Sequence, residues 1–542
     1  MIRPSPSAIL RPAPTDRGWQ YTGGSAAFPG CPAATRATRN DRIAPVSSTV
    51  QDPVLEAFES LVRRRPDRLL VASPTRRVTA GGLEAMAQCA AGHLDAARLP
   101  PGELVGLAAP DGAAFLATFL ALRSRGLVPL LLDWKAPRAE CDRIARGLGS
   151  AWTFRCRRRW PTGREDWRLA GHGPRSRALP GCTLDPATAA VKLTSGSTGA
   201  PRGIVTPGDA LFADDAALAR TMGLAAGERI LGAVPMSHSY GLASIALPAL
   251  TRGSTVVVPD DRSGPYGPLR AARELDVTFL PTVPAFLRAL LAAERPPALP
   301  ASLRLTVSAG APLDPETAVR FREVYGRRIH VFYGSSETGG ICFDREGDAG
   351  EHGSVGPPVE GVRVGLRPLE GGEGSDREGA ATRGVVVVSS PAVGSTYLPC
   401  PDERLSGGRF VSGDLACWEG GALRLVGRTD DLINVRGKKV NPREVEAVLA
   451  ALPEVTEAVA FGVPCGARGE PTLRAVVAAQ PGGLTQEGLL AWCRERLAEH
   501  KVPRSVVLVN RIPRTPRGKV DRNALLNLRP GRVADAVRSQ AP

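Results

Sequence analysis

The chain has 542 residues, 43% of them hydrophobic and 23% charged, which is typical of a globular protein of two or three domains. No apolar run approaches the roughly 18 residues that a membrane span needs, so we expect a soluble, cytoplasmic protein without such a span. The ten cysteines form no C-x-x-C pairs, which argues against a zinc site or a disulfide framework and favours buried thiols in a reducing compartment.

The net charge of +15 is the unusual property of the composition, and it raises the question of a nucleic-acid partner. Residues 1–50 carry six Arg against two Asp, and residues 155–177 carry eight Arg against two acids. Neither stretch interleaves aromatic side chains in a base-stacking pattern. We therefore expect no nucleic-acid partner, and interpret the two stretches as a solvated basic face or a surface for an acidic partner.

Taken in chain order, residues 1–48 hold seven prolines and no hydrophobic period, which indicates a disordered or misassigned extension without a secretory signal. From Pro53 to Val62, apolar residues fall on one helical face. We then expect strands at 103–109, 127–132, 255–259, 277–280 and 303–308. We expect helices at 115–122 and 286–291, and a third helix that ends at 275. This alternation predicts an α/β fold with a largely parallel sheet covered by helices on both faces.

The pattern changes beyond about residue 380, where Gly-rich connections join short strands at 385–388 and 422–426. After a boundary near 430, Asn441, Pro442 and Glu444 form a helix start with an N-cap, a first-position proline and a first-turn acid. Strands at 458–463, 473–479 and 506–509 and a helix at 489–497 outline a small α+β domain. We thus expect an extension at 1–48, a large domain at 49–429 with a β-rich subdomain, a small domain at 430–528 and a tail at 529–542.

A loop rich in hydroxyl groups and glycines follows the apolar residues 189–191. Glycine permits positive φ angles and brings N–H groups close to an anion, the hydroxyl groups add donors, and an arginine adds permanent charge. A flexible linker has a similar composition, so the loop alone leaves both interpretations open. The pattern of a P-loop NTPase and the G-x-G-x-x-G of a nicotinamide enzyme are absent. The candidate phosphate ligands are Thr194, Ser195, Gly196, Ser197, Thr198, Gly199 and Arg202.

A second block, residues 331–340, places an acid among hydroxyl groups and glycines directly after an expected strand. Mg²⁺ binds one or two carboxylates and shares the rest of its ligand shell with water and substrate phosphates. Glu337 is therefore a candidate metal ligand, although a solvent-facing acid in an exposed turn would have the same local sequence.

Both blocks resemble signature sequences of the adenylate-forming superfamily, which comprises acyl-CoA synthetases, peptide-synthetase adenylation domains and luciferases. Arg202 stands where that family usually has Lys, and Ser336 where it usually has Thr. The resemblance implies that residues 194–203 hold the β- and γ-phosphates of ATP and that Tyr333, followed by Gly334, stacks on adenine. It further implies that Ser336 meets the α-phosphate and that Glu337 binds Mg²⁺.

Further blocks occur in the order in which that family has them. The Ser-Ala-Gly-Ala-Pro sequence at 308–312 resembles the loop that lies along adenine, which implies nucleotide contacts for Gly310, Ala311 and Pro312. The Ser-Gly-Asp sequence at 412–414 resembles the ribose-binding block, and there Asp414 is the implied acceptor of the ribose hydroxyl groups.

The remaining blocks concern the small domain. Residues 427–437 resemble the family's hinge, which implies that Arg428 contacts the ribose and phosphate side, that Asp430 is the pivot and that Gly437 lies beside a pantetheine channel. Asn434 departs from the Lys often found there. Residues 513–522 resemble the terminal block whose lysine, here Lys519, enters the site for adenylation.

The resemblance implies a large N-terminal AMP-binding domain, a mobile C-terminal domain and two half-reactions. A carboxylate attacks the α-phosphorus of ATP, giving an acyl-adenylate and pyrophosphate, and a thiol then displaces AMP. ATP, Mg²⁺ and CoA, or the phosphopantetheine of a carrier protein, are the implied cofactors. The implied catalytic residues are Lys519, Glu337, Ser336 and His238.

Residues 235–241 resemble the block that gates the family's acyl pocket. His238 has no second histidine or acid at ligand spacing, which argues against a metal site there. The block also lacks the Asp that holds the α-ammonium group in amino-acid-activating domains. We therefore expect an aryl, fatty or other small acid without a free α-amino group, in a pocket formed by His238, Val283, Pro284 and Ala309.

Several functions remain open at this point. The first is a stand-alone acyl-CoA synthetase, and the second is an acyl-AMP ligase that loads a carrier protein, which the basic stretch near Arg157 favours slightly. A non-catalytic adenylate-binding scaffold is a third, kept open by the departures at Arg202, Ser336 and Asn434. Luciferase-type oxidation is a fourth that the motifs do not exclude.

Overall fold

The computed structural model describes residues 52–172, 184–194, 201–260, 266–368, 383–429, 433–435, 438–465, 470–479, 484–497, 499–514 and 520–528. The expected extension at 1–48 and the tail at 529–542 lie outside these residues. Among the described helices, none combines the length and the hydropathy that a membrane span requires.

The first sheet of the large domain has eight strands, and its middle strands are parallel. Only its two edges are antiparallel, where β2 pairs with β1 and β14 with β13. In spatial order the strands are β14 (Gly339–Phe343), β13 (His330–Ser335), β12 (Leu305–Ser308), β11 (Phe279–Thr282), β9 (Arg229–Leu231), β10 (Thr255–Val257), β1 (Leu69–Ala72) and β2 (Arg77–Thr79).

The second sheet has seven strands with a parallel centre and antiparallel edges. In spatial order the strands are β17 (Thr396–Leu398), β8 (Arg202–Pro207), β7 (Thr188–Thr194), β4 (Val128–Leu131), β3 (Leu104–Ala108), β5 (Trp152–Cys156) and β6 (Trp167–Gly171). The expected α/β fold, with sheets covered by helices, is confirmed. The expected strands at 103–109, 127–132, 255–259, 277–280 and 303–308 correspond to β3, β4, β10, β11 and β12, and the structure divides them between two sheets. Strand order depends on long-range crossovers, which local periodicity does not encode.

Helices cover the two sheets and fill the space between them. α3 is buried along its whole length and α2 contacts both α3 and the strands β1, β2 and β6, so these two helices lie between the sheets. The helices are α1 (Pro53–Arg64), α2 (Ala80–Ala97), α3 (Ala113–Arg123), α4 (Arg138–Gly147), α5 (Gly208–Met222), α6 (Ser239–Gly241), α7 (Leu247–Arg252), α8 (Gly267–Glu274), α9 (Pro284–Leu291), α10 (Pro315–Tyr325) and α11 (Ala349–His352). Four of these helices confirm expectations from the sequence. They are α1, expected to begin at Pro53, α3, expected at 115–122, α8, expected to end at 275, and α9, expected at 286–291.

A smaller antiparallel sheet completes the large domain, as expected from the Gly-rich pattern beyond residue 380. Its strands are β15 (Arg363–Arg367), β16 (Arg383–Ser389), β18 (Leu405–Ser406), β19 (Arg409–Glu419) and β20 (Ala422–Arg428). Cysteine burial only partly matches the expectation, because Cys400 at the edge of this region is exposed whereas Cys141, Cys156, Cys342 and Cys493 are buried.

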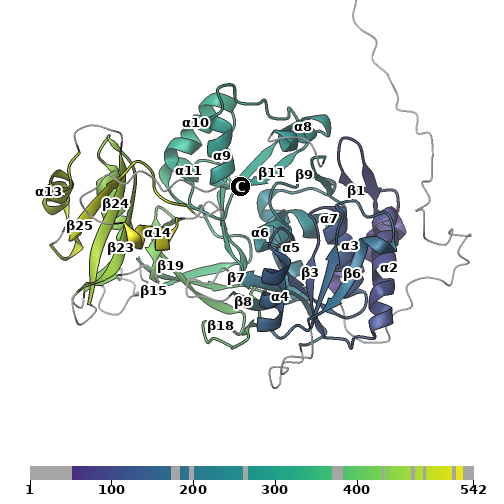
Figure 1. Ribbon diagram of the computed structural model, residues 1–542. Helices are drawn as coiled ribbons and strands as arrows, with labels where there is room; N and C mark the ends of the chain where they lie inside the picture. Colours follow the sequence, from purple (N-terminus) through teal and green to yellow (C-terminus); the bar gives the residue numbers. More distant parts are fainter. Residues whose placement is uncertain are drawn as a thin grey trace, which may run out of the picture.

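The C-terminal domain has its own core, centred on Val445, Leu449 and Val477. The expected helix start is confirmed: Asn441 caps the helix by accepting a hydrogen bond from the Arg443 amide, and its Nδ2 donates to the Val426 carbonyl at 2.7 Å, which ties the helix to β20. In Figure 1 this domain, with its three-stranded sheet, lies to one side of the large sheets. Its elements are β21 (Ile433–Val435), β22 (Lys438–Val440), α12 (Pro442–Ala450), β23 (Val455–Cys465), β24 (Glu470–Ala479), α13 (Gln486–Arg496), β25 (Ser505–Val509) and α14 (Arg522–Asn527).

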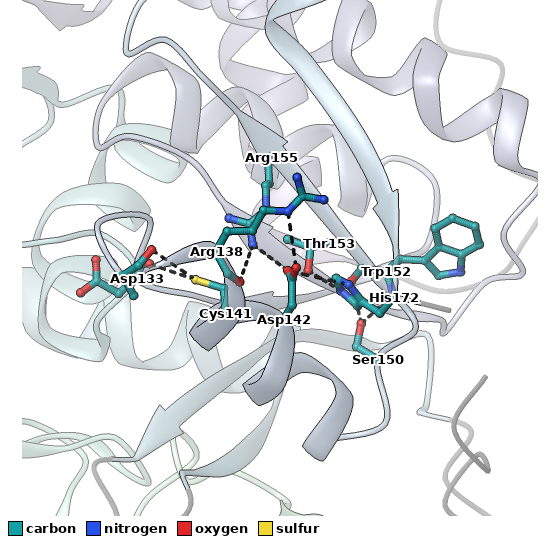
Figure 2. Close-up of polar contacts among 10 residues, drawn as sticks. Asp133, Arg138, Cys141, Asp142, Ser150, Trp152, Thr153, Arg155 and His172 are labelled. Atoms are coloured by element: carbon teal, nitrogen blue, oxygen red, sulfur yellow. Dashed lines mark hydrogen bonds and ion pairs between the residues drawn. The ribbon is translucent and has the colours of Figure 1, made fainter. Parts of the chain in front are cut away.

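A polar cluster holds α4 against β5 and β6 in the large domain (Figure 2). Asp142 forms ion pairs with Arg155 at 2.8 Å and Arg138 at 3.5 Å, and lies 3.7 Å from Nδ1 of His172. The other ring nitrogen of His172 is hydrogen-bonded to the Thr153 hydroxyl group at 2.7 Å. Thr, His and Asp in this order resemble a hydrolytic triad, but Thr153 is fully buried, which excludes attack on a substrate. The cluster is structural.

This cluster makes stability depend on pH. Burial, which outweighs the attraction of Asp142, lowers the pKa of His172 below its ordinary value. The unfolded chain therefore binds the proton more readily, so the contribution of His172 to stability is present above about pH 6.5 and is lost as the pH falls. We expect the melting temperature to drop less between pH 7.5 and pH 5.5 in His172→Gln than in the wild type. A matched control is His352→Gln at an exposed position, which should keep the wild-type drop.

Candidate active site

The candidate site lies at the carboxyl ends of β12 and β13. The Gly-Ala-Pro sequence at 310–312 begins two residues after the end of β12. Tyr333 and Gly334 lie near the end of β13, just before Ser336 and Glu337. Ligands of open α/β sheets bind in this position, outside the carboxyl ends of the strands.

One cavity, of about 330 Å³, contains the residues that the sequence assigned to the nucleotide. Four of its lining residues come from β20 and α12, so both domains contribute to its wall. The predicted residues on its wall are Gly310, Ala311, Pro312, Tyr333, Gly334, Asp414 and Arg428. Sequence reasoning missed Val355 and Arg443, which also line it and have no motif of their own.

Asp414 is held firmly in the nucleotide cavity. The Tyr333 hydroxyl group donates to one carboxylate oxygen at 2.6 Å, and a guanidinium nitrogen of Arg428 donates to the other at 2.9 Å. Burial and the charge of Asp414 together raise the pKa of Tyr333 well above its usual value, so the phenol keeps its proton. A carboxylate has about four lone-pair positions, which leaves Asp414 able to accept two ribose hydroxyl groups.

Glu337 is half-buried, and one of its oxygens accepts a hydrogen bond from the Tyr397 hydroxyl group at 2.8 Å. Among the described residues, no group of three or more His, Cys, Asp or Glu side chains could hold a metal ion. A single oriented carboxylate fits Mg²⁺, which takes its remaining ligands from phosphates and water.

Arg202 makes contacts that the sequence did not reveal. Its guanidinium group lies over the ring of Tyr397, 3.7 Å from the centroid, and donates to Asp402 at 2.9 Å and to the Cys400 carbonyl at 3.2 Å. Tyr397 in turn holds Glu337. A planar guanidinium group can stack flat on the ring while its separate N–H groups donate to a carboxylate and a carbonyl, whereas a lysine ammonium group is a point charge without a planar face. The arginine in place of the family's lysine therefore has a structural role: it holds Tyr397, which in turn holds Glu337.

A second cavity, of about 370 Å³, corresponds to the expected acyl pocket. His238, Val283 and Ala309 line it, whereas Pro284 begins α9 and is not part of its lining. Much of the remaining wall is apolar, and its residues Leu242, Ala243 and Leu247 belong to a segment in which a π-helical turn (Leu242–Ala246) joins α6 to α7. Such turns are frequent at functional sites.

The block at 235–241 is joined to the phosphate side by one hydrogen bond. The Ser239 hydroxyl group donates to that of Ser336 at 2.8 Å, which connects the acyl-pocket block to the residue expected to meet the α-phosphate. The Asp111 carboxylate accepts from the Met236 amide at 2.7 Å and holds the start of the block in place. His238 is exposed.

Two charged residues on the wall of the second cavity were missed entirely, Lys192 from β7 and Asp214 from α5. Gly339 is required next to Asp214, because its φ is +69° and a Cβ there would lie 2.3 Å from the carboxylate. Strand alternation could have placed Lys192 on one face of β7, but no local signal indicates that this face lines a cavity. The predicted residues Ser195, Gly196, Ser197, Thr198, Gly199, Asp430, Gly437 and Lys519 lie outside the described residues.

Comparison with known proteins agrees with these motifs. The model of the AMP-binding enzyme family matches residues 58–398, and that of the AMP-binding enzyme C-terminal domain matches residues 444–519. The chain therefore belongs to the AMP-binding enzyme family, the adenylate-forming superfamily that the motifs predicted. It is a ligase of the acyl-CoA synthetase type.

Relatives of known name match most of the chain. A feruloyl-CoA synthase of an Amycolatopsis species is 32% identical over 451 residues, 79% of this chain and 89% of the relative. A sulfoacetate–CoA ligase of Cupriavidus necator is 28% identical over 89% of this chain and all of the relative. The crystal structure of ATP-bound MatB from Rhodopseudomonas palustris has the same fold, with a TM-score of 0.71 at 24% identity over 88% of this chain and 98% of MatB.

Proposed function

We propose that the protein uses ATP and Mg²⁺ to activate a carboxylic acid without a free α-amino group as its acyl-adenylate, and then transfers the acyl group to the thiol of CoA. The observation that carries this proposal is the meeting of the two cavities. Gly310, Phe332 and Gly334 line both of them, so a nucleotide in one and an acid in the other would bring α-phosphate and carboxylate together at these residues.

The first half-reaction needs no general base, because a carboxylic acid is ionised at neutral pH. A carboxylate oxygen attacks the α-phosphorus, and the bond to the pyrophosphate oxygen breaks. Catalysis then consists of positioning and of neutralising charge. Asp414 would orient the ribose, the Ser336 hydroxyl group would meet an α-phosphate oxygen, and Glu337 would hold Mg²⁺, which supplies positive charge to the phosphates.

In the second half-reaction the CoA thiolate attacks the acyl carbon, and AMP leaves with the bonding electron pair. The proposal assigns Asp430 as the pivot of the small domain, and Gly437 as a residue beside the thiol channel. Both relatives described above are named as CoA enzymes, which supports CoA as the acceptor.

A carrier protein as acceptor receives no support from the basic stretch. Its described residues form β5, β6 and their connection, and Figure 1 shows β6 on the side of the large domain away from the C-terminal sheet. Arg155 and Arg158 are already engaged by Asp142 and Asp166. The thiol is expected to enter beside the C-terminal domain, so an acidic carrier bound at this stretch would lie far from the entry.

The direct test is release of pyrophosphate from ATP and Mg²⁺ across a panel of aryl, short-chain and long-chain acids, each with and without CoA. We expect release with one class of acid and multiple turnovers only when CoA is present. Tight ATP binding with no release for any acid would instead indicate an adenylate-binding scaffold. Equal turnover with and without CoA would contradict its role as the acceptor.

A further inference from the structure

Two opposite charges, Lys192 and Asp214, are buried in the wall of the acyl cavity. The residues are 4% and 6% exposed, yet both line the cavity of about 370 Å³. Lys192 projects from β7, and Asp214 projects from α5. Burying a charge is costly unless a partner compensates it, so the partners of these groups indicate what the cavity accommodates.

The two groups are close enough to influence each other but do not form a direct ion pair. The charges of Asp214 and Glu337 partly offset the effect of burial, which lowers the pKa of Lys192. Asp214 accepts one hydrogen bond, from the Gly340 amide to Oδ1 at 2.9 Å. Within the part of the chain that the structure describes, no group accepts a hydrogen bond from the Lys192 ammonium group and none donates to Oδ2 of Asp214.

We propose that Lys192 and Asp214 together bind a hydroxyl group on the acid, so that the substrate is a hydroxyaryl acid. This inference rests on the proposed function and names the substrate class of the same site. The Lys192 ammonium group donates to the hydroxyl oxygen, and the hydroxyl group donates its own proton to Asp214. Both buried charges then gain the partner that the described part of the protein does not supply.

Charge balance selects a hydroxyl group over other polar groups. A second carboxylate on the acid would pair with Lys192 but would be repelled by Asp214, and would add an uncompensated negative charge to a mostly apolar cavity. A protonated amino group would pair with Asp214 but would be repelled by the positive charge of the Lys192 ammonium group. A hydroxyl group is both donor and acceptor and adds no charge, so it satisfies both residues.

The rest of the cavity suits an aromatic ring. Its wall contains the apolar side chains Leu211, Val234, Leu242 and Leu247, together with the ring of Phe332. The Tyr240 ring packs 5.7 Å from that of Phe332, and its hydroxyl group donates to the Val307 carbonyl at 3.0 Å, which fixes this aromatic side of the cavity. Sites with an apolar body and a few placed polar groups bind small organic molecules by shape and orient them by the polar groups.

The experiment compares pairs of acids that differ by one hydroxyl group, using hydroxybenzoates and hydroxycinnamates against benzoate and cinnamate. Pyrophosphate release gives kcat/KM for each acid in the wild type, in Lys192→Met and in Asp214→Asn. We expect the wild type to prefer one hydroxylated acid by about 10²-fold or more, because an analogue lacking the hydroxyl group leaves buried polar groups unpaired. Each variant should reduce this ratio at least tenfold.

Leu242→Ala is the matched control, because it enlarges the same cavity without touching the charges. It should change kcat/KM for both members of a pair and keep their ratio. A purely structural role of Lys192 and Asp214 would lower both activities equally in Lys192→Met and in Asp214→Asn, so that their ratio is kept, and this result would overturn the proposal. Thermal shifts on ATP addition check that each variant still binds nucleotide.

Three other results would also overturn the inference. They are equal use of hydroxylated and unsubstituted acids by the wild type, a preference for dicarboxylates, and a preference for amino acids. In the first two of these cases pyrophosphate release still establishes the proposed function. A preference for amino acids would in addition contradict the part of the proposed function that excludes a free α-amino group. Absence of release with every acid, while ATP binding persists, would instead contradict the proposed function itself.

Discussion

Replacing Glu337 by Gln should lower the rate of pyrophosphate release about 10²- to 10³-fold, the loss typical of removing one preorganised charge-stabilising group. Gln keeps the shape of the side chain and still accepts from the Tyr397 hydroxyl group, which donates to Glu337 at 2.8 Å. Only the negative charge that would bind Mg²⁺ is lost. The measurement is the initial rate at rising Mg²⁺ concentration, and we expect the variant to need far more metal for half-maximal rate.

Tyr397→Phe is the matched control for this prediction. It removes the hydrogen bond to Glu337 but leaves the carboxylate and the ring under Arg202 in place. Loss of one hydrogen bond to a charged group costs about 1.5–3 kcal/mol. Because the carboxylate itself remains, we expect the lower end of that range, a decrease of roughly tenfold. An unchanged rate and an unchanged Mg²⁺ requirement in Glu337→Gln would show that this carboxylate is not the metal ligand.

The part of the site that follows directly from sequence is the part built from contiguous blocks. The sequence at 308–312, Tyr333 and Asp414 each lie in a short motif that follows or belongs to a strand, and the structure brings all three to one cavity. The helix start at Asn441 was predictable for the same reason, since caps and first-turn residues are local. Features of this kind depend only on residues that are neighbours in the sequence, so they can be predicted without knowledge of the fold.

The residues that sequence reasoning missed act through long-range contacts. Tyr397 reaches Glu337 across 60 positions, and its strand β17 reaches β8 only through antiparallel pairing at the edge of the second sheet. Asp214 meets the Gly340 amide across 126 positions. No periodicity relates such positions, because they are joined by the order of strands in the sheets rather than by spacing along the chain. For the same reason the order of the strands within the two sheets was not predicted.

The arginine at position 202 shows how a motif can mislead at a single residue. Its charge suggested a phosphate ligand, and that role stays a prediction, whereas the structure shows the side chain stacked on Tyr397 and bonded to Asp402. The arginine that departs from the family sequence therefore contacts Tyr397, and Tyr397 donates a hydrogen bond to Glu337, the candidate metal ligand. The departure therefore does not favour a scaffold without catalysis.

Lys519→Ala should separate the two half-reactions. A lysine ammonium group can bridge the acid and the α-phosphate as negative charge develops between them, so we expect adenylation to fall about 10²- to 10³-fold. Thioester formation from a pre-formed acyl-adenylate and CoA should keep its rate, because we expect a swing of the small domain to withdraw Lys519 from the site for that step. Lys501→Ala is the matched control: it removes a lysine of the same domain that pairs with Glu444, and adenylation should persist. If both half-reactions fell together in Lys519→Ala, or if Lys501→Ala reproduced its effect, Lys519 would be needed for folding of the domain rather than for the chemistry of adenylation.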